Sequence, residues 1–192
     1  MQTTRTNILL ALTAAAALLL PLPSHGQLGG LGKAAGITTG TVTAESLMSD
    51  LCGGLDYFAK ANTNFAAALL SKEEVAKINA ELAALKPKED PTAAQAFNKE
   101  TCAKIKAAAE AMISSGQALS ETQKQQVKAG QGEAAKGVAK WGLVGASLAM
   151  AAKSGNSDAQ LATAIPAAQQ MIKDLPDIKS MLGTINQLNK IK

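Results

Sequence analysis

Apolar residues recur at alternating spacings of four and three along residues 43–70. This spacing places them on one face of a helix, and Thr43 is a suitable N-cap at its start. Asn62 fills the one polar position of the stripe, where a buried amide would fix the helix register. Gly53 and Gly54 lie beside the stripe, where we expect them to bend the helix. The apolar stripe consists of Ala44, Met48, Leu51, Leu55, Phe58, Phe65 and Leu69.

A second helix is predicted to begin directly after the first. Ser71 and Glu74 have the S-x-x-E spacing of a capping box, in which each side chain binds the other residue's backbone N–H. Leu70 and Val75 flank the box as a hydrophobic staple. The helix is expected to end before Pro87, because proline interrupts the backbone hydrogen bonds of a helix.

Start signals of the same kind predict the remaining helices. Asp90–Pro91 combines an N-cap acid with proline at the first helical position, and this helix is expected to end near Gly116. A fourth helix begins at Ser120 or Glu121, and Ser157 can cap another. Leu175–Pro176 opens the last helix, which carries apolar residues at helical spacing to the end of the chain.

The fourth segment contains an unusual concentration of small side chains. Residues 141–152 are apolar on all sides except for Ser147, which is typical of a buried helix. Trp141 is interpreted as a core anchor or, alternatively, as part of an apolar ligand pocket. A stripe of glycine and alanine lets two helices approach closely, either within the chain or in a contact with a partner or a second copy. This candidate helix-contact face comprises Gly132, Ala135, Ala139, Gly142, Ala146 and Ala149.

Composition supports the same fold class. The chain is 47% hydrophobic but only 3% aromatic, and alanine makes up about a fifth of it. Few β-branched and aromatic residues argue against a sheet, and abundant alanine favours helices. We therefore predict an all-α protein, with residues 43–192 forming a single bundle of five or six helices.

Residues 1–26 are interpreted as a cleaved signal peptide. They contain one charged side chain, Arg5, then an apolar run from Ile8 to Leu20 and small residues at Ser24 and Gly26. The alternative is a membrane anchor, but thirteen helical residues span only about 20 Å of a hydrocarbon core about 30 Å thick. The sequence thus predicts a secreted or periplasmic protein, with residues 27–42 as a flexible lead and no integral membrane segment after cleavage.

Two cysteines, Cys52 and Cys102, lie on different predicted helices. In an exported protein such a pair is expected to form a disulfide, here between the first and third helices. The alternative is a pair of reactive thiols, but redox pairs usually have the spacing Cys-x-x-Cys.

The remaining residues favour no catalytic chemistry. Signal cleavage would remove the only histidine, which excludes His-dependent triads and the usual zinc sites. The adjacent acids Glu73–Glu74 and Glu89–Asp90 lie at helix starts, where they complement the helix dipole. No phosphate-binding loop is present, and dispersed lysines without arginine do not form a nucleic-acid patch. We expect no metal, no cofactor and no nucleic-acid partner.

These features together lead to a functional hypothesis. The first expectation is an exported, non-catalytic helical protein that acts by protein–protein binding or by self-association. The alternative is a carrier of lipid or another apolar ligand, because amphipathic helices can exchange helix contacts for lipid contacts. A disulfide between the first and third helices would restrict such opening.

Overall fold

The computed structural model describes residues 43–87, 89–154, 165–166, 168–170 and 172–191, with side chains described only to Leu148 in the fourth helix. The predicted signal peptide, the flexible lead and the helix start at Ser157 lie outside the described residues. Within the described part, every regular element is a helix and there is no strand, as the composition predicted.

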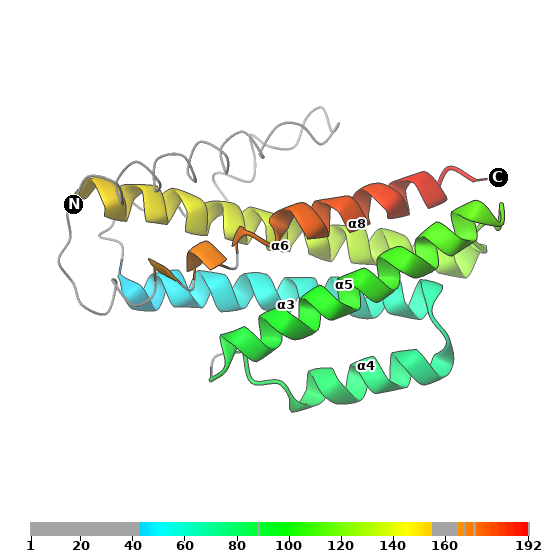
Figure 1. Ribbon diagram of the computed structural model, residues 1–192, viewed down its shortest axis with the longest axis horizontal. Coiled ribbons are helices and arrows are strands. Elements are labelled where there is room, and N and C mark those ends of the chain that lie inside the picture. The colour runs from blue at the N-terminus through cyan, green and yellow to red at the C-terminus, as the bar shows by residue number, and fades with distance from the viewer. Residues whose placement is uncertain (1–42, 88, 155–164, 167, 171, 192) are drawn as a thin grey trace.

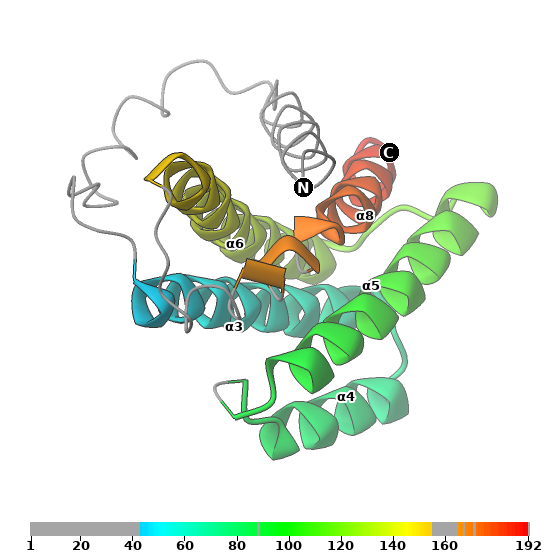
Figure 2. The same cartoon turned by 60° about the vertical axis from the view of Figure 1, so that its left-hand side comes forward.

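Five helices make up this part of the chain. α3 and α6 lie antiparallel and form the largest interhelical contact (Figures 1 and 2). α5 crosses α3 and also packs against α8. α4 lies on the outside of the bundle, against α3 and near α5 (Figure 2). Their bounds are Ala44–Leu69 for α3, Lys72–Ala84 for α4, Pro91–Ser114 for α5, Glu121–Ser154 for α6 and Leu175–Leu188 for α8.

The helix starts follow the local signals in the sequence. Ser71 and Glu74 form the predicted capping box, and the Asp90 side chain accepts from the Ala93 N–H. Thr43 also caps α3, but its reciprocal partner is Ser46. These side chains satisfy backbone N–H groups that the first turn of a helix leaves without a partner.

Gly116 ends α5 in the left-handed conformation, with φ of 66°. Its N–H donates to the Ile113 carbonyl, and the N–H of Gln117 donates to the Met112 carbonyl. This pair of bonds is the Schellman motif, which favours glycine because other residues are strained at positive φ. The sequence therefore placed the end of this helix correctly.

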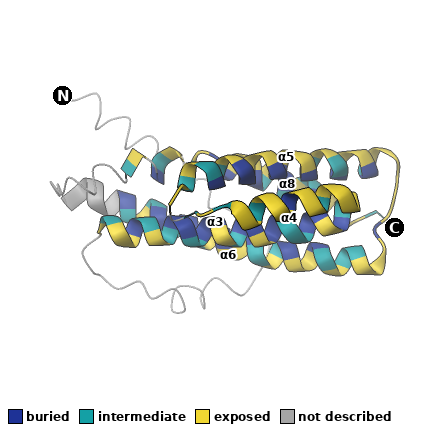
Figure 3. Cartoon of the chain, turned by 90° about the horizontal axis from the view of Figure 1, so that it is seen from below, coloured by how far each residue is buried: buried dark blue, intermediate teal, exposed yellow. Residues whose placement is uncertain are grey.

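The main core fills the space between α3, α5, α6 and α8, so that each of these helices is buried on one side (Figure 3). The expected burial of residues 141–152 on all sides is wrong for the side chains that the structure describes. Trp141, Val144 and Leu148 are buried, whereas Leu143 is half-buried and Ala146 is exposed. An apolar sequence here does not mean burial all round, because alanine and glycine are tolerated on an exposed helix face.

Three aromatic rings of the α3–α6 contact lie against glycines of the opposite helix. A Cβ added at Gly54 would lie 2.2 Å from the Trp141 indole, and at Gly137 it would lie 2.8 Å from the Phe58 ring. Gly130 faces Phe65 in the same way, at 2.6 Å. Such distances are too short for a real side chain, so these glycines are the spaces that the rings occupy. Gly54 thus serves close packing, and the bend that its sequence position suggested stays a prediction.

Candidate functional site

No disulfide joins the two cysteines, contrary to the sequence prediction. Both side chains are buried, but they face different surroundings. Cys52 Sγ donates to the carbonyl oxygen of Pro87, at 3.4 Å, in the connection between α4 and α5. Cys102 Sγ donates to Asn62 Oδ1, at 3.5 Å, between α3 and α5.

The register of α5 on α3 explains why the disulfide does not form. Cys102 lies beside Asn62, which follows Cys52 by about ten residues, or about 15 Å, along α3. A disulfide requires Cα atoms within about 7 Å of each other. The sequence placed both cysteines near the apolar stripes, but periodicity alone carries no information on how two helices are offset along their axes.

A buried polar cluster marks this contact between α3 and α5. Asn62 Nδ2 donates to Asn98 Oδ1 at 3.1 Å, and Asn98 Nδ2 donates to the Ala94 carbonyl at 3.0 Å. Burial raises the pKa of the Cys102 thiol to about 12. The thiol therefore stays protonated at neutral pH, and the thiolate needed for nucleophilic or redox chemistry is scarce.

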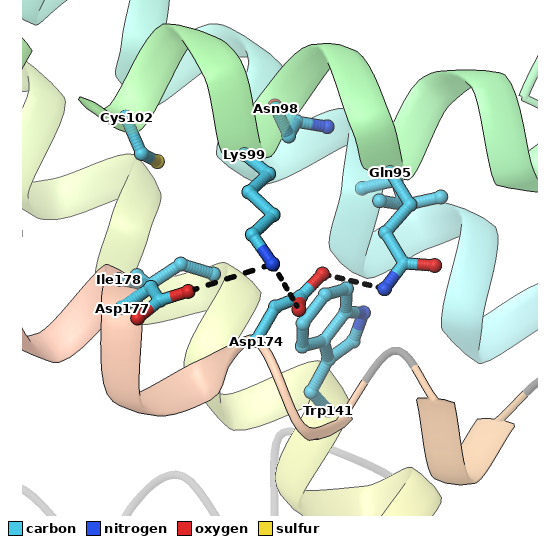
Figure 4. A pocket seen from close by; sticks show the side chains of 9 residues that line it. Gln95, Asn98, Lys99, Cys102, Trp141, Asp174, Asp177 and Ile178 are labelled. Carbon is cyan, nitrogen blue, oxygen red and sulfur yellow. Dashed lines mark hydrogen bonds and ion pairs between the residues drawn. The ribbon is translucent and has the colours of Figure 1, made fainter. Parts of the chain in front are cut away.

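A narrow cleft lies between α5 and α8, with Cys102 at one end (Figure 4). Its free volume is about 10 Å³, which leaves room for at most one water molecule. Drug-sized ligands occupy pockets of about 300 Å³ or more, so this cleft is too small for a substrate. Its lining residues are Leu55, Gln95, Asn98, Lys99, Cys102, Trp141, Asp174, Asp177 and Ile178.

The polar rim of the cleft ties α8 to α5. The amide of Gln95 donates to Asp174, a mostly buried carboxylate at the N-terminus of α8. Figure 4 shows Lys99 between two carboxylates, 3.9 Å from Asp174 and 4.0 Å from Asp177. Lys99 and Asp177 are largely exposed, and exposed ion pairs contribute little to stability. The arrangement positions one helix on another and contains no nucleophile paired with a base.

The small-residue stripe on α6 faces away from the helices that the structure describes. Gly132, Ala135, Ala139 and Ala146 are exposed and Gly142 is half-buried, while the side chain of Ala149 lies outside the described residues. The described helices therefore do not pack on these positions, and the choice between a contact within the chain and one with a partner or a second copy stays a prediction. We call Gly132, Ala135, Ala139, Gly142 and Ala146 the outer face of α6.

Sequence reasoning missed the glycines that pack inside the chain. Gly130 and Gly137 are seven residues apart, and so are the rings that they accommodate, Phe58 and Phe65. This matched spacing was the signal that the sequence offered, because two antiparallel helices bring residues at equal spacings along each helix into contact.

Trp141 is an anchor of the core, the first of its two interpretations. The indole is buried, its Nε1 donates to the Leu51 carbonyl at 3.2 Å, and it meets the Phe58 ring edge-on with centroids 4.8 Å apart.

Within the part of the chain that the structure describes, no three metal-binding side chains gather in one place. The same residues include no helix of the length and apolar character needed to cross a bilayer. Comparisons with protein-family models, with curated proteins and with solved structures gave no match.

Proposed function

We propose that the chain is an exported helical protein without catalytic activity, which binds a protein partner or a second copy of itself through the outer face of α6. The observation that supports this proposal is the outward position of the small-residue stripe. Small side chains on a helix surface let a second helix come close, with backbone contacts along its length.

Gly132 strengthens the argument for a contact at this face. It lies in the interior of a long helix, and a Cβ added there would meet nothing within 4 Å. A glycine in a helix interior costs about 0.5–1 kcal/mol relative to alanine. No packing within the described chain offsets this cost at Gly132, whereas close approach of another helix would do so.

Paired charge substitutions on α6 test the proposal. Ala135→Glu with Ala139→Glu places two carboxylates on the outer face, where exposure in the monomer lets the fold tolerate them. Ala103→Glu with Ala107→Glu is a matched control, since both alanines are exposed on α5 at the same spacing. Native mass spectrometry and light scattering over a concentration series would measure assembly, and cross-linking in extracts of the source cells would measure partner binding.

We expect the wild-type chain and the α5 control to form the same assembly or complex, and the α6 variant to lose it. The proposal would be contradicted if the wild-type chain stayed monomeric and formed no cross-linked complex that the α6 substitutions abolish. Intact mass of the exported protein tests cleavage near residue 26 in the same preparation.

The carrier alternative has one supporting observation. Because no disulfide links α3 to α5, no covalent bond there opposes separation of the amphipathic helices. The cleft between α5 and α8 is too small for a lipid, so a lipid bound there would have to displace helix contacts. Co-purified lipid, or vesicle binding that increases with anionic lipid content, would favour this alternative. We expect no catalytic turnover that depends on Lys99 or Cys102.

A further inference from the structure

α4 is attached to the bundle by a small contact of its own. Ile78 is its single buried side chain, and with Ala66 of α3 and Phe97 of α5 it forms a cluster separate from the main core. The partly buried residues around this cluster are Leu70, Val75, Leu82 and Leu85. The other face of α4 is exposed (Figure 3). Few buried apolar contacts are typical of segments that open locally.

The polar contacts of α4 are mostly within itself or its connections. The capping box joins Ser71 to Glu74, and Lys86 pairs with Glu89 in the connection that follows. Lys104 of α5 interacts electrostatically with Glu74 and Glu81, but Lys104 and Glu74 lie at the surface, where such attraction is weak. The Ile78 cluster is therefore the principal attachment of α4.

The residues that follow α4 contact a cysteine of α3. Leu85 packs against the Ile78 cluster, and the Pro87 carbonyl accepts from Cys52 Sγ. Cys102 lies instead beneath α8 and among the residues that line the cleft with Trp141. The two thiols thus contact different parts of the molecule, Cys52 the connection that follows α4 and Cys102 the main core.

We propose that α4 and Leu85–Pro87 form a lid, which opens locally while α3, α5, α6 and α8 stay folded. Opening exposes the apolar side chains of Ala66 and Phe97 and gives solvent access to Cys52. The lid controls access to this side of the bundle independently of the outer face of α6.

Two readouts on the purified chain test the lid. Hydrogen exchange followed by mass spectrometry measures opening of α4, α3 and α6 separately. Alkylation with iodoacetamide, read on the peptides of Cys52 and Cys102, measures access to each thiol. Each rate is divided by the rate in the urea-unfolded chain, which removes differences in intrinsic reactivity.

We expect α4 amides to exchange at least about 100-fold faster than buried amides of α3 and α6, and Cys52 to react at least about tenfold faster than Cys102. Ile78→Ala should accelerate α4 exchange and Cys52 alkylation together by about tenfold or more, and leave Cys102 unchanged. Ile185→Ala is the matched control, because Ile185 is buried in the main core on α8. It should not accelerate α4 or Cys52 selectively.

Equal protection of α4 and α3 in the wild-type chain, with equal reactivity of the two thiols, would overturn the proposal. So would Cys52 alkylation that follows Cys102 in the Ile78 variant. Should Ile78→Ala fail to fold, Ile78→Val removes one methylene group, and the wild-type comparison decides the question by itself.

Discussion

α3 has two antiparallel neighbours, and they contact it in different ways. Against α6 it presents Phe58 and Phe65, each fitted to a glycine, and receives Trp141 over Gly54. Against α4 it presents Ala66, a small side chain that contacts a cluster of branched aliphatic residues. The first contact depends on the shape of single positions, and the second depends only on apolar character.

The α3–α6 contact shows how a chain with few aromatic residues can build a firm core. A large ring that fills the space beside a glycine brings two helix backbones together and leaves little void, as close packing requires. Aliphatic side chains at a surface cluster can rearrange, so their contact tolerates volume changes better. We expect substitutions at the α3–α6 contact to have larger effects than equivalent changes at α4.

The largest effect is expected for Trp141→Ala. It removes the most voluminous buried side chain together with its hydrogen bond to Leu51, and should lower the free energy of unfolding by about 3–5 kcal/mol. Leu82→Ala on the half-buried side of α4 should cost less than half as much. Urea denaturation followed by circular dichroism measures both, and similar losses would contradict the comparison.

Two glycines of α6 should respond to the same substitution with opposite signs. Gly137→Ala forces a Cβ against the Phe58 ring and should cost about 1–3 kcal/mol. Gly132→Ala meets nothing within 4 Å and should stabilise the monomer by about 0.5–1 kcal/mol through helix propensity. Thermal and urea unfolding of the two variants, side by side, provide the measurement. Destabilisation by both substitutions would show that contact with an aromatic ring is not what distinguishes Gly137 from Gly132.

The smallest effect is expected at the start of α4. Hydrogen bonds from the Ser71 side chain and backbone hold the pKa of Glu74 below its usual value, with smaller contributions from Lys104 on α5 and Lys77 on α4. Because the folded pKa is lowered, the capping contribution is complete above the unfolded pKa and is lost as pH falls through the folded pKa. Exchange protection of α4 should therefore decline below about pH 4.5.

Glu74→Gln distinguishes this effect from general acid unfolding. Glutamine keeps the capping geometry but does not titrate, so α4 protection in this variant should change little between pH 5 and 3, values that bracket ordinary carboxyl pKa values at about 4. Glu73→Gln makes the same change of charge next to the capping box and should retain the wild-type dependence. Amide exchange by NMR, normalised to unstructured peptides, measures all three. If α4 protection in Glu74→Gln declined with falling pH as it does in the wild-type chain, Glu74 would not be the cause.

Local signals in the sequence predicted the helices well. Ser71, Asp90 and Gly116 mark helix ends through hydrogen bonds to nearby backbone, so a few neighbouring residues contain the whole interaction. Apolar periodicity also identified the inward side of α3 and of α8, including Leu51, Leu55 and Ile185.

What depends on two helices together was not predictable in the same way. The disulfide between Cys52 and Cys102 was wrong because the axial offset of α5 on α3 is a property of the pair. The small-residue stripe could not be divided into inner and outer contacts from the sequence, because Gly132 and Gly130 look alike locally and only the position of Phe65 distinguishes them. The register role of Asn62 stays a prediction, although the structure adds its partner, Asn98.

The pairing of α3 with α6 has a consequence for the order in which the chain acquires structure during its synthesis. Leu51 and Trp141, which it joins, are 90 residues apart in the chain. At about 5–20 residues per second, about 4–15 seconds pass between addition of Phe65 and addition of Trp141. In that interval the rings of Phe58 and Phe65 lack their α6 partner, and such exposed apolar surface is prone to aggregate. α4 and α5 are synthesised in between, so they are the first helices that can pack against α3 and cover its apolar side chains.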